Sequence, residues 1–321
     1  IEDCESRIQE LGNQNVKTIL DYSAEGKESD EDFDLSMGKA IASIERAKLD
    51  LNVPFCVFKV TALMPFDVLN KVSAKEELTE EETLAYQKGR NRIDIICRNA
   101  ASAEIPVMID AEESWIQDGI DEIALVMMYR YNIEGALVYN TAQMYRHDRL
   151  EYLKQLYKQA IEEGFYIGMK IVRGAYMEKE RERAARKGYN DPIQPNKEAT
   201  DSDYNLAINF CIEHLDRIAI CAGTHNEASS QLLTELLDEK GLNRDDKRIF
   251  FSQLLGMSDH ISFNLSNKDF NVAKYVPYGP VSEVMPYLIR RAEENTSIAG
   301  QTGRELRLIQ EELDRRAKEA N

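Results

Sequence analysis

The chain has 321 residues, of which 43% are hydrophobic and 30% charged, enough for one large domain with an extensive core. Its 57 acidic and 40 basic side chains give a net charge of −17, which disfavours nucleic acid and anionic membrane as partners. The five cysteines contain no CxxC pair and the four histidines no HExxH motif, so we expect no metal site and a reducing, cytoplasmic location. No apolar run reaches the roughly 20 residues that span a bilayer, although peripheral contact with the inner face of a membrane stays open.

Residues 1–54 are expected to form an N-terminal helical segment, because Asp34–Asp50 places its apolar residues on one helical stripe. From residue 55 onward, short apolar runs alternate with helical patterns up to a C-terminal helix, and we expect 55–321 to be the main domain. The eight predicted strands are 55–63, 106–112, 135–140, 166–175, 217–223, 248–254, 260–265 and 271–276.

Several of these runs are apolar almost throughout, which is typical of parallel strands buried on both faces. Eight such strands alternating with helices predict an α/β fold, a distorted (β/α)8 barrel of the TIM type. The alternative is an open doubly wound sheet, but no GxGxxG or GxxxxGK[ST] motif follows any strand. We therefore favour the barrel.

Polar side chains stand at the ends of the predicted strands, where barrel enzymes place their working residues. They are Lys59, Asp110 with Glu112, Gln143, Lys170 with Arg173, Thr224–His225–Asn226, Gln253 and Tyr275. Any one of them suits an ordinary loop or cap, but the whole set is harder to explain in that way. Lys59 lies among apolar residues at the barrel mouth, so it needs an anion beside it or a pKa shifted toward neutrality. Strand alternation is expected to place Lys170 and Arg173 on one side.

The stretch KYVPYGPVSEVMPYLIRRAEEN (274–295) leads from an apolar strand through a turn into a charged helix. On that helix Arg290 and Arg291 are adjacent, and Tyr287 and Glu294 each lie three or four residues from both of them, so the four side chains are expected to converge. Two guanidinium groups can hold one carboxylate from two sides. The alternative is a solvated helix with Arg–Glu pairs; the preceding strand and turn favour a site.

Seven segments, in this order, closely resemble the proline dehydrogenase family. They are FKVTAL (58–63), MIDAE (108–112), KIVRGAYMEKER (170–181), GYNDPIQPNKEAT (188–200), GTHN (223–226), QLLGM (253–257) and the 274–295 stretch. The resemblance implies a monofunctional, FAD-dependent enzyme that oxidises proline to 1-pyrroline-5-carboxylate by hydride transfer from proline C5 to flavin N5. It also implies a quinone as electron acceptor and functional coupling to a pyrroline-5-carboxylate dehydrogenase, without the aldehyde dehydrogenase domain of bifunctional relatives.

The resemblance also assigns roles to individual residues. It implies catalysis by Lys59, Asp110, Tyr275, Arg290 and Arg291, and substrate binding by Lys59, Tyr275, Tyr287, Arg290, Arg291 and Glu294. Flavin contacts are implied for Gln143, Lys170, Val172, Arg173, Gly174, Ala175, Thr224, His225, Asn226, Gln253 and Leu255. The three cations of this substrate site, set against Asp110 and Glu294, leave one positive charge, which matches the carboxylate of an amino acid.

Three other interpretations stay open on the sequence alone. Lys59 in a barrel also suits a Schiff-base aldolase, and the second alternative is a non-catalytic barrel that binds an acidic metabolite. Hydroxyproline is the alternative substrate within the family. Against it, Tyr275 is expected to pack on the substrate ring and to leave little space for a 4-hydroxyl group.

Overall fold

A closed barrel of eight parallel strands forms the centre of the protein, in the order β1-β2-β3-β4-β5-β6-β7-β8. The computed structural model describes residues 4–22, 28–281, 284–285, 289, 307 and 310–316. The strands are β1 (Val16–Tyr22), β2 (Phe55–Phe58), β3 (Val107–Ile109), β4 (Val138–Gln143), β5 (Ile167–Val172), β6 (Ile218–Gly223), β7 (Ile249–Leu254) and β8 (Val272–Tyr278). The predicted barrel is therefore confirmed.

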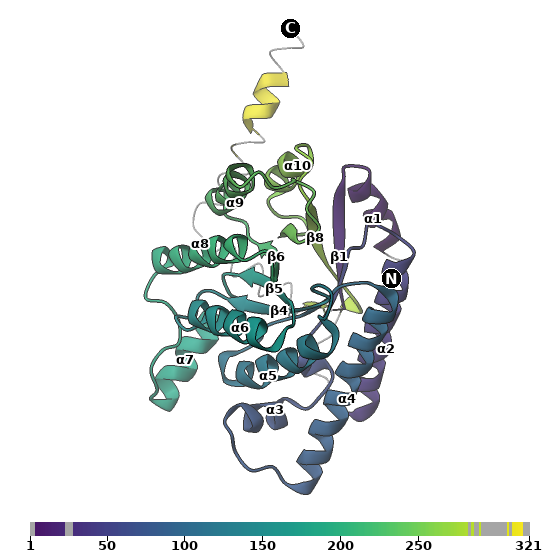
Figure 1. Cartoon of the computed structure of the whole chain (residues 1–321), viewed down its shortest axis with the longest axis vertical. Helices are drawn as coiled ribbons and strands as arrows, with labels where there is room; N and C mark the ends of the chain where they lie inside the picture. Colours follow the sequence, from purple (N-terminus) through teal and green to yellow (C-terminus); the bar gives the residue numbers. More distant parts are fainter. Residues whose placement is uncertain are drawn as a thin grey trace.

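Helices surround the strands on the outside of the barrel (Figure 1). They are α1 (Glu5–Gly12), α2 (Asp30–Lys48), α3 (Phe66–Ser73), α4 (Glu80–Ala103), α5 (Ser114–Tyr131), α6 (Arg149–Glu163), α7 (Met177–Lys187), α8 (Lys197–Glu213), α9 (Glu227–Glu239) and α10 (Asp259–Ser266), with a 3-10 turn, η2 (Val60–Ala62), after β2. Side-chain caps begin α2, α4, α8 and α9; at α4, Thr79 and Glu82 form a capping box.

The prediction that residues 1–54 are a helical segment outside the barrel is wrong for residues 16–22. These residues form β1, which pairs with β2 and with β8 and so closes the barrel. Lys17, Thr18 and Asp21 interrupt the apolar character of the strand, which hid it in the sequence. A boundary at residue 54 would therefore separate the first strand from the other seven.

The predicted strand at 260–265 is also wrong, because these residues lie in α10. The buried positions Ile261 and Leu265 are four apart, which is the spacing of one helical face. A six-residue apolar run is too short to tell a buried strand from a helix by periodicity. The predicted number of strands is correct because two errors cancel: 260–265 is not a strand, and the strand at 16–22 was not predicted.

Side chains in the barrel interior are apolar over most of its length. Ten buried residues form the inner cluster: Ile19, Phe55, Val57, Met108, Tyr139, Ala219, Cys221, Phe250, Ala273 and Tyr275. Alternate residues of the same strands, such as Val272 and Val276 of β8, point outward and join the larger cluster under the helices. The parity of each strand position therefore decides whether a polar side chain enters the barrel or the layer outside it.

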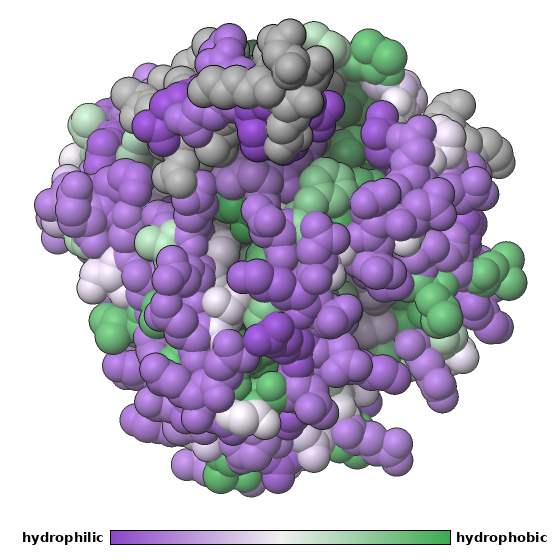
Figure 2. Space-filling model, turned by 90° about the horizontal axis from the view of Figure 1, so that it is seen from above, coloured by the Kyte–Doolittle hydropathy of each residue, from purple (hydrophilic) through white to green (hydrophobic). Residues whose placement is uncertain are grey.

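The face shown in Figure 2 is predominantly hydrophilic, with apolar residues scattered over it. This agrees with a chain of which 30% is charged. Among the described residues, no helix is long and apolar enough to cross a membrane.

Candidate active site

A buried carboxylate, Asp110, organises the charged end of the barrel. It follows β3 and accepts from Lys59 Nζ, which follows β2, at 2.5 Å. Lys170 Nζ from β5 donates to the other oxygen, Oδ1, whereas the Tyr275 hydroxyl from β8 donates to Oδ2, the oxygen that Lys59 binds, at 2.8 Å. Lys170 Nζ also lies 5.0 Å from the centre of the Tyr275 ring. Four predicted residues from four strands thus meet at one point.

The charges in this cluster stabilise one another. Burial raises the pKa of the Asp110 carboxyl, but Lys170 and Lys59 outweigh burial and hold that pKa below its usual range. For Lys59 burial opposes the charged form, yet the carboxylates of Asp110 and Asp21 keep its pKa well above the usual value. Lys59 is therefore an ammonium group at neutral pH, and a protonated amine cannot attack a carbonyl as a nucleophile.

Asp21 is a site residue that the sequence interpretation missed. It lies at the end of β1, is fully buried, and is the second carboxylate that raises the pKa of Lys59. The signal in the sequence was an aspartate near the end of VKTILDY, but that run had not been recognised as a strand. Tyr176, just before α7, is a further neighbour, since its phenol also acts on the pKa of Lys59.

Glu112 joins the predicted substrate side of the site to the predicted cofactor side. Its carboxylate accepts from the Thr61 amide at 3.1 Å and from the Thr61 hydroxyl at 2.5 Å. Its own peptide oxygen accepts from Gln143 Nε2 at 2.7 Å, and Gln143 Oε1 accepts from the Ala175 amide at 3.0 Å. Burial raises the pKa of Glu112 to about 7, with Lys59 acting in the opposite direction.

Arg173 points away from Lys170, contrary to the prediction that both lie on one side. Lys170 faces into the barrel, whereas Arg173 follows the end of β5 at the opposite parity. The guanidinium of Arg173 donates to Asp201 at 2.6 Å, to Thr224 Oγ1 at 2.6 Å and to Ser229 Oγ at 2.9 Å. Residues three apart on a strand face opposite sides, so the expectation misapplied the alternation.

The other predicted cofactor residues gather at the ends of β6 and β7. Gln253 Nε2 donates to the Thr224 carbonyl at 3.1 Å, and His225 Nδ1 lies 3.0 Å from Ser258 Oγ. Asn226 caps α9 by accepting from the Ser229 amide at 3.1 Å, and the Leu255 amide donates to the Tyr275 carbonyl at 3.0 Å. Val172 packs against Gly223, where an added Cβ would lie 2.9 Å from its Cγ1.

At Gly174 the backbone passes directly over the ring of Tyr145. Gly174 has φ +143°, and an added Cβ would lie 2.4 Å from that ring. At the ends of the adjacent strands β4, β5 and β6 the chain supplies an amide, an ammonium, a threonine hydroxyl and an imidazole, from Gln143, Lys170, Thr224 and His225. A flavin presents carbonyl and imine acceptors, a ring N–H and anionic phosphates, so the donor set here fits such a group.

Four predicted substrate residues, Tyr287, Arg290, Arg291 and Glu294, lie outside the described residues. Their convergence on the barrel mouth stays a prediction. Within the described part of the site, Lys59 and Lys170 face three acidic groups, Asp21, Asp110 and Glu112. An anionic substrate would therefore need cations from outside the described residues, and Arg290 and Arg291 are predicted to supply them.

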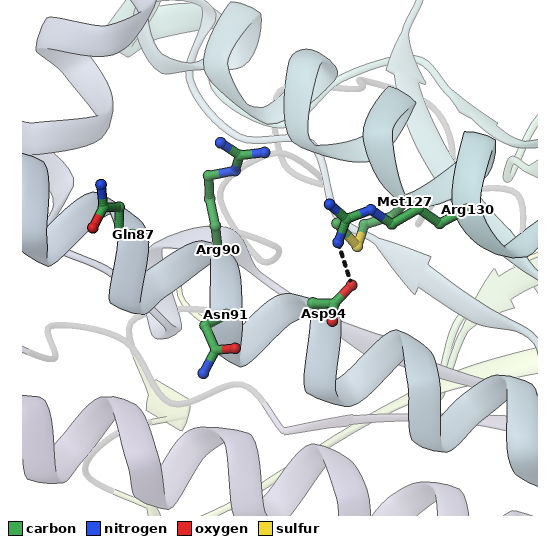
Figure 3. Close-up of a pocket in the computed structure, with 6 residues that line it drawn as sticks. All are labelled: Gln87, Arg90, Asn91, Asp94, Met127 and Arg130. Atoms are coloured by element: carbon green, nitrogen blue, oxygen red, sulfur yellow. Dashed lines mark hydrogen bonds and ion pairs between the residues drawn. The ribbon is translucent and has the colours of Figure 1, made fainter.

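A separate hollow of about 190 Å³ lies between α4 and α5, on the outside of the barrel (Figure 3). Its lining residues are Gln87, Arg90, Asn91, Asp94, Met127 and Arg130. Arg130 is paired with Asp94 at 2.8 Å. The hollow contains none of the residues predicted for chemistry, so the barrel mouth remains the candidate active site.

The fold defines a (β/α)8-barrel protein. Its buried lysine–aspartate–lysine cluster lies at the C-terminal ends of the strands, where barrel enzymes carry their active sites. The sequence model of the family described as "Proline dehydrogenase" matches residues 4–304. The chain belongs to the proline dehydrogenase family, whose members are flavoenzymes.

Individual proteins are similar over much of the chain. The chain is 41% identical over 246 residues to mitochondrial proline dehydrogenase 1 of Homo sapiens, covering 76% of this chain and 41% of that protein. It is 34% identical over 318 residues to the carbapenem antibiotics biosynthesis protein CarD of Pectobacterium carotovorum, covering 98% of this chain and 82% of that protein. The chain thus spans less than half the length of the human relative.

Among solved structures, proline utilization A (PutA) from Bdellovibrio bacteriovorus, inactivated by N-propargylglycine, superposes with a TM-score of 0.82 at 19% sequence identity. The superposition covers 93% of this chain and 32% of that chain. This likeness supports the fold.

Proposed function

We propose that the protein is an FAD-dependent proline dehydrogenase that oxidises L-proline to 1-pyrroline-5-carboxylate, the first step of proline catabolism. The observation that carries the proposal is the Asp110 carboxylate, which binds Lys59, Lys170 and Tyr275 at one point beside the segments that resemble the family's flavin site. Family membership supports the substrate and the flavin; the donor set at the ends of β4, β5 and β6 supports the position of the flavin.

In the proposed site each residue has a physical task. Lys59, Arg290 and Arg291 hold the proline carboxylate, and Asp110 keeps Lys59 charged and oriented. The ring of Tyr275 packs on the pyrrolidine, with its hydroxyl fixed by Asp110. Tyr287 and Glu294 complete the substrate site, and Glu294 orients the two arginines.

The reaction removes two electrons from proline. A hydride leaves C5, a proton leaves the ring nitrogen, and a C5=N bond forms, so no strong general base is required when the amine enters unprotonated. Bound FAD would supply the two-electron acceptor for this hydride. The residues that would hold the FAD are those at the ends of β4 to β7: Gln143, Lys170, Val172, Arg173, Gly174, Ala175, Thr224, His225, Asn226, Gln253 and Leu255.

Reoxidation by a quinone and coupling to a pyrroline-5-carboxylate dehydrogenase belong to the same proposal. A quinone acceptor would bring a cytoplasmic protein to the inner face of a membrane. One solved neighbour is described as a bifunctional proline utilization A protein, which supports the coupling.

The test is the visible spectrum of the purified protein. A flavin spectrum that bleaches on anaerobic addition of proline, with FAD released on denaturation, supports the proposal. A colourless protein, or a flavin that proline does not reduce, would contradict it. Covalent trapping of a ketone by borohydride would favour the Schiff-base aldolase; the charged state of Lys59 argues against that alternative.

A further inference from the structure

Lys274 is a lysine with a fully buried side chain on the outer face of β8. Its neighbours Ala273 and Tyr275 point into the barrel, whereas Lys274 shares its outward parity with Val272 and Val276. It therefore stands outside the Lys59–Asp110–Lys170 cluster, although it is next in sequence to Tyr275. A buried ammonium group needs dedicated acceptors, and the identity of those acceptors indicates what the residue holds.

Three acceptors of Lys274 come from the segment that joins β7 to α10. Lys274 Nζ donates to the Met257 carbonyl at 2.5 Å and to the Leu254 carbonyl at 3.4 Å. It also pairs with Asp259 Oδ1, in the first turn of α10, at 2.7 Å. One cation thus binds both ends of a single loop, residues 254–259, which we call the β7 loop.

The β7 loop adopts a conformation that needs such support. Gly256 has φ +76°, and Ser258 has φ 50° although it carries a side chain. Left-handed backbone is unfavourable for a residue other than glycine, and it persists where surrounding contacts hold it. The Lys274 contacts flank Ser258 on both sides in the sequence, at Met257 and Asp259.

Ser258 in turn reaches the predicted flavin residues. Its Oγ lies 3.0 Å from His225 Nδ1, and its carbonyl accepts from Ser262 Oγ at 3.3 Å. Ser262 Oγ also donates to Gln253 Oε1 at 2.8 Å, and Gln253 Nε2 donates to the Thr224 carbonyl at 3.1 Å. Lys274 is therefore linked to His225 and Gln253 through the backbone of residues 257–259 and the hydrogen bonds of Ser258 and Ser262.

We propose that Lys274 is a positioning residue: by holding the β7 loop through Met257 and Asp259, it sets Ser258 and thereby orients His225 and Gln253 toward the flavin. This inference rests on the proposed function, because it concerns how the same flavin site is built. Lys274 itself touches neither substrate nor cofactor in this arrangement. The coupling through Ser258 distinguishes it from a lysine that only adds stability.

The test is a double-mutant cycle on the flavin-loaded protein, with flavin release measured by its fluorescence. Lys274→Met keeps the length of the side chain and removes the ammonium group, and Ser258→Ala removes the link to His225. Each single variant should weaken flavin binding by about tenfold. Since both act through one chain of contacts, the double variant should be no more than about threefold weaker than the worse single variant.

Arg46→Met is the matched control. Arg46 is a largely buried cation between α2 and α1 that binds Glu5 and Asp50, away from the barrel mouth. Its loss should lower the melting temperature and leave flavin affinity within about twofold of the wild type. If Arg46→Met loses flavin as readily as Lys274→Met, the effect of Lys274 is general destabilisation and the inference fails.

Two further outcomes would overturn the proposal. One is unchanged flavin affinity in Lys274→Met; the other is a double variant whose fold loss of flavin affinity equals the product of the two single losses. If Lys274→Met does not fold, Ser258→Ala alone decides, because flavin affinity equal to that of the wild type would remove the proposed link. A wild type that takes up no flavin would instead contradict the proposed function. The two failures are therefore distinguishable.

Discussion

The Tyr275 hydroxyl donates to Asp110 Oδ2 at 2.8 Å, across the barrel from β8 to β3. The same oxygen accepts from Lys59 Nζ at 2.5 Å. Asp110 therefore fixes two side chains at once. One is Tyr275, which we propose packs on the substrate ring, and the other is Lys59, which we propose binds the substrate carboxylate. The ring and the charge of the substrate would be held by parts of one network.

Tyr275 offers a test of substrate choice. Tyr275→Phe keeps the ring and removes one hydrogen bond to a charged group, which is worth about 1.5 kcal/mol or about tenfold in kcat/KM for proline. Tyr275→Ser removes the ring, so it should damage proline oxidation more. We expect the wild type to prefer proline over hydroxyproline by at least roughly tenfold in kcat/KM, and this variant should narrow that ratio. Steady-state kinetics with both substrates on all three proteins check this; a ratio unmoved by Tyr275→Ser would return Tyr275 to a purely structural role.

The sequence supported the barrel because its inner strands carry apolar runs with turn-forming residues between them. It also supported the residues at the ends of those strands, since a polar group such as Lys59 or Asp110 in an apolar run needs a partner. The family resemblance, rather than periodicity, linked them to a flavin.

What the sequence left unpredicted depends on three-dimensional pairing. β1 was missed because a strand with Lys17 and Asp21 is stable only when β2 and β8 flank it. The opposite directions of Lys170 and Arg173 depend on where β5 ends, and the acceptors of Lys274 come from a loop whose shape no local propensity encodes. Asp21 could have been found by asking which strand closes the barrel.

The second prediction is that Arg173 serves flavin binding, whereas Arg290 and Arg291 serve substrate binding. Arg173 is held by Asp201, Thr224 and Ser229 on the predicted cofactor side, so Arg173→Ala should give protein that loses flavin on purification. Arg290→Met and Arg291→Met should keep flavin and lose about one to two decades in kcat/KM, since a hydrogen bond to a buried carboxylate is worth about 1.5–3 kcal/mol. Flavin absorbance per mole of protein, measured alongside kinetics, separates the two; equal flavin loss in all three variants would contradict the assignment.

Gly174 tests the backbone bend at the predicted flavin site. Gly174→Ala would place a methyl group 2.4 Å from the Tyr145 ring at φ +143°, so we expect a loss of about 3 kcal/mol in the free energy of unfolding and loss of bound flavin. Gly38, in the middle of α2, is the control, because a Cβ added there meets nothing within 4 Å. Gly38→Ala should raise stability by up to about 1 kcal/mol. Urea denaturation of both variants checks the contrast, and equal stabilities would contradict it.

Glu112 gives the protein a pH dependence of known sign. Burial raises its pKa in the folded state from 4.5 to about 7, so between these values the folded protein binds the proton more tightly than the unfolded chain. The contribution of Glu112 to stability is therefore greatest at low pH and falls as the pH rises to about 7, by at most about 3 kcal/mol. The depressed pKa of Asp110 acts in the opposite sense, but only below the usual range of an aspartate.

Glu112→Gln should remove this slope, because the amide does not titrate and its oxygen can still accept from the Thr61 amide. The difference in the free energy of unfolding between variant and wild type should grow in favour of the variant between about pH 5 and about pH 8. Glu122→Gln, at an exposed position on α5, should leave the wild-type slope in place. Urea unfolding at both pH values measures the slopes. If the wild-type and Glu112→Gln curves run parallel, Glu112 is ionised throughout this range in the folded protein and its carboxylate is stabilised by its contacts with Thr61 and the nearby Lys59.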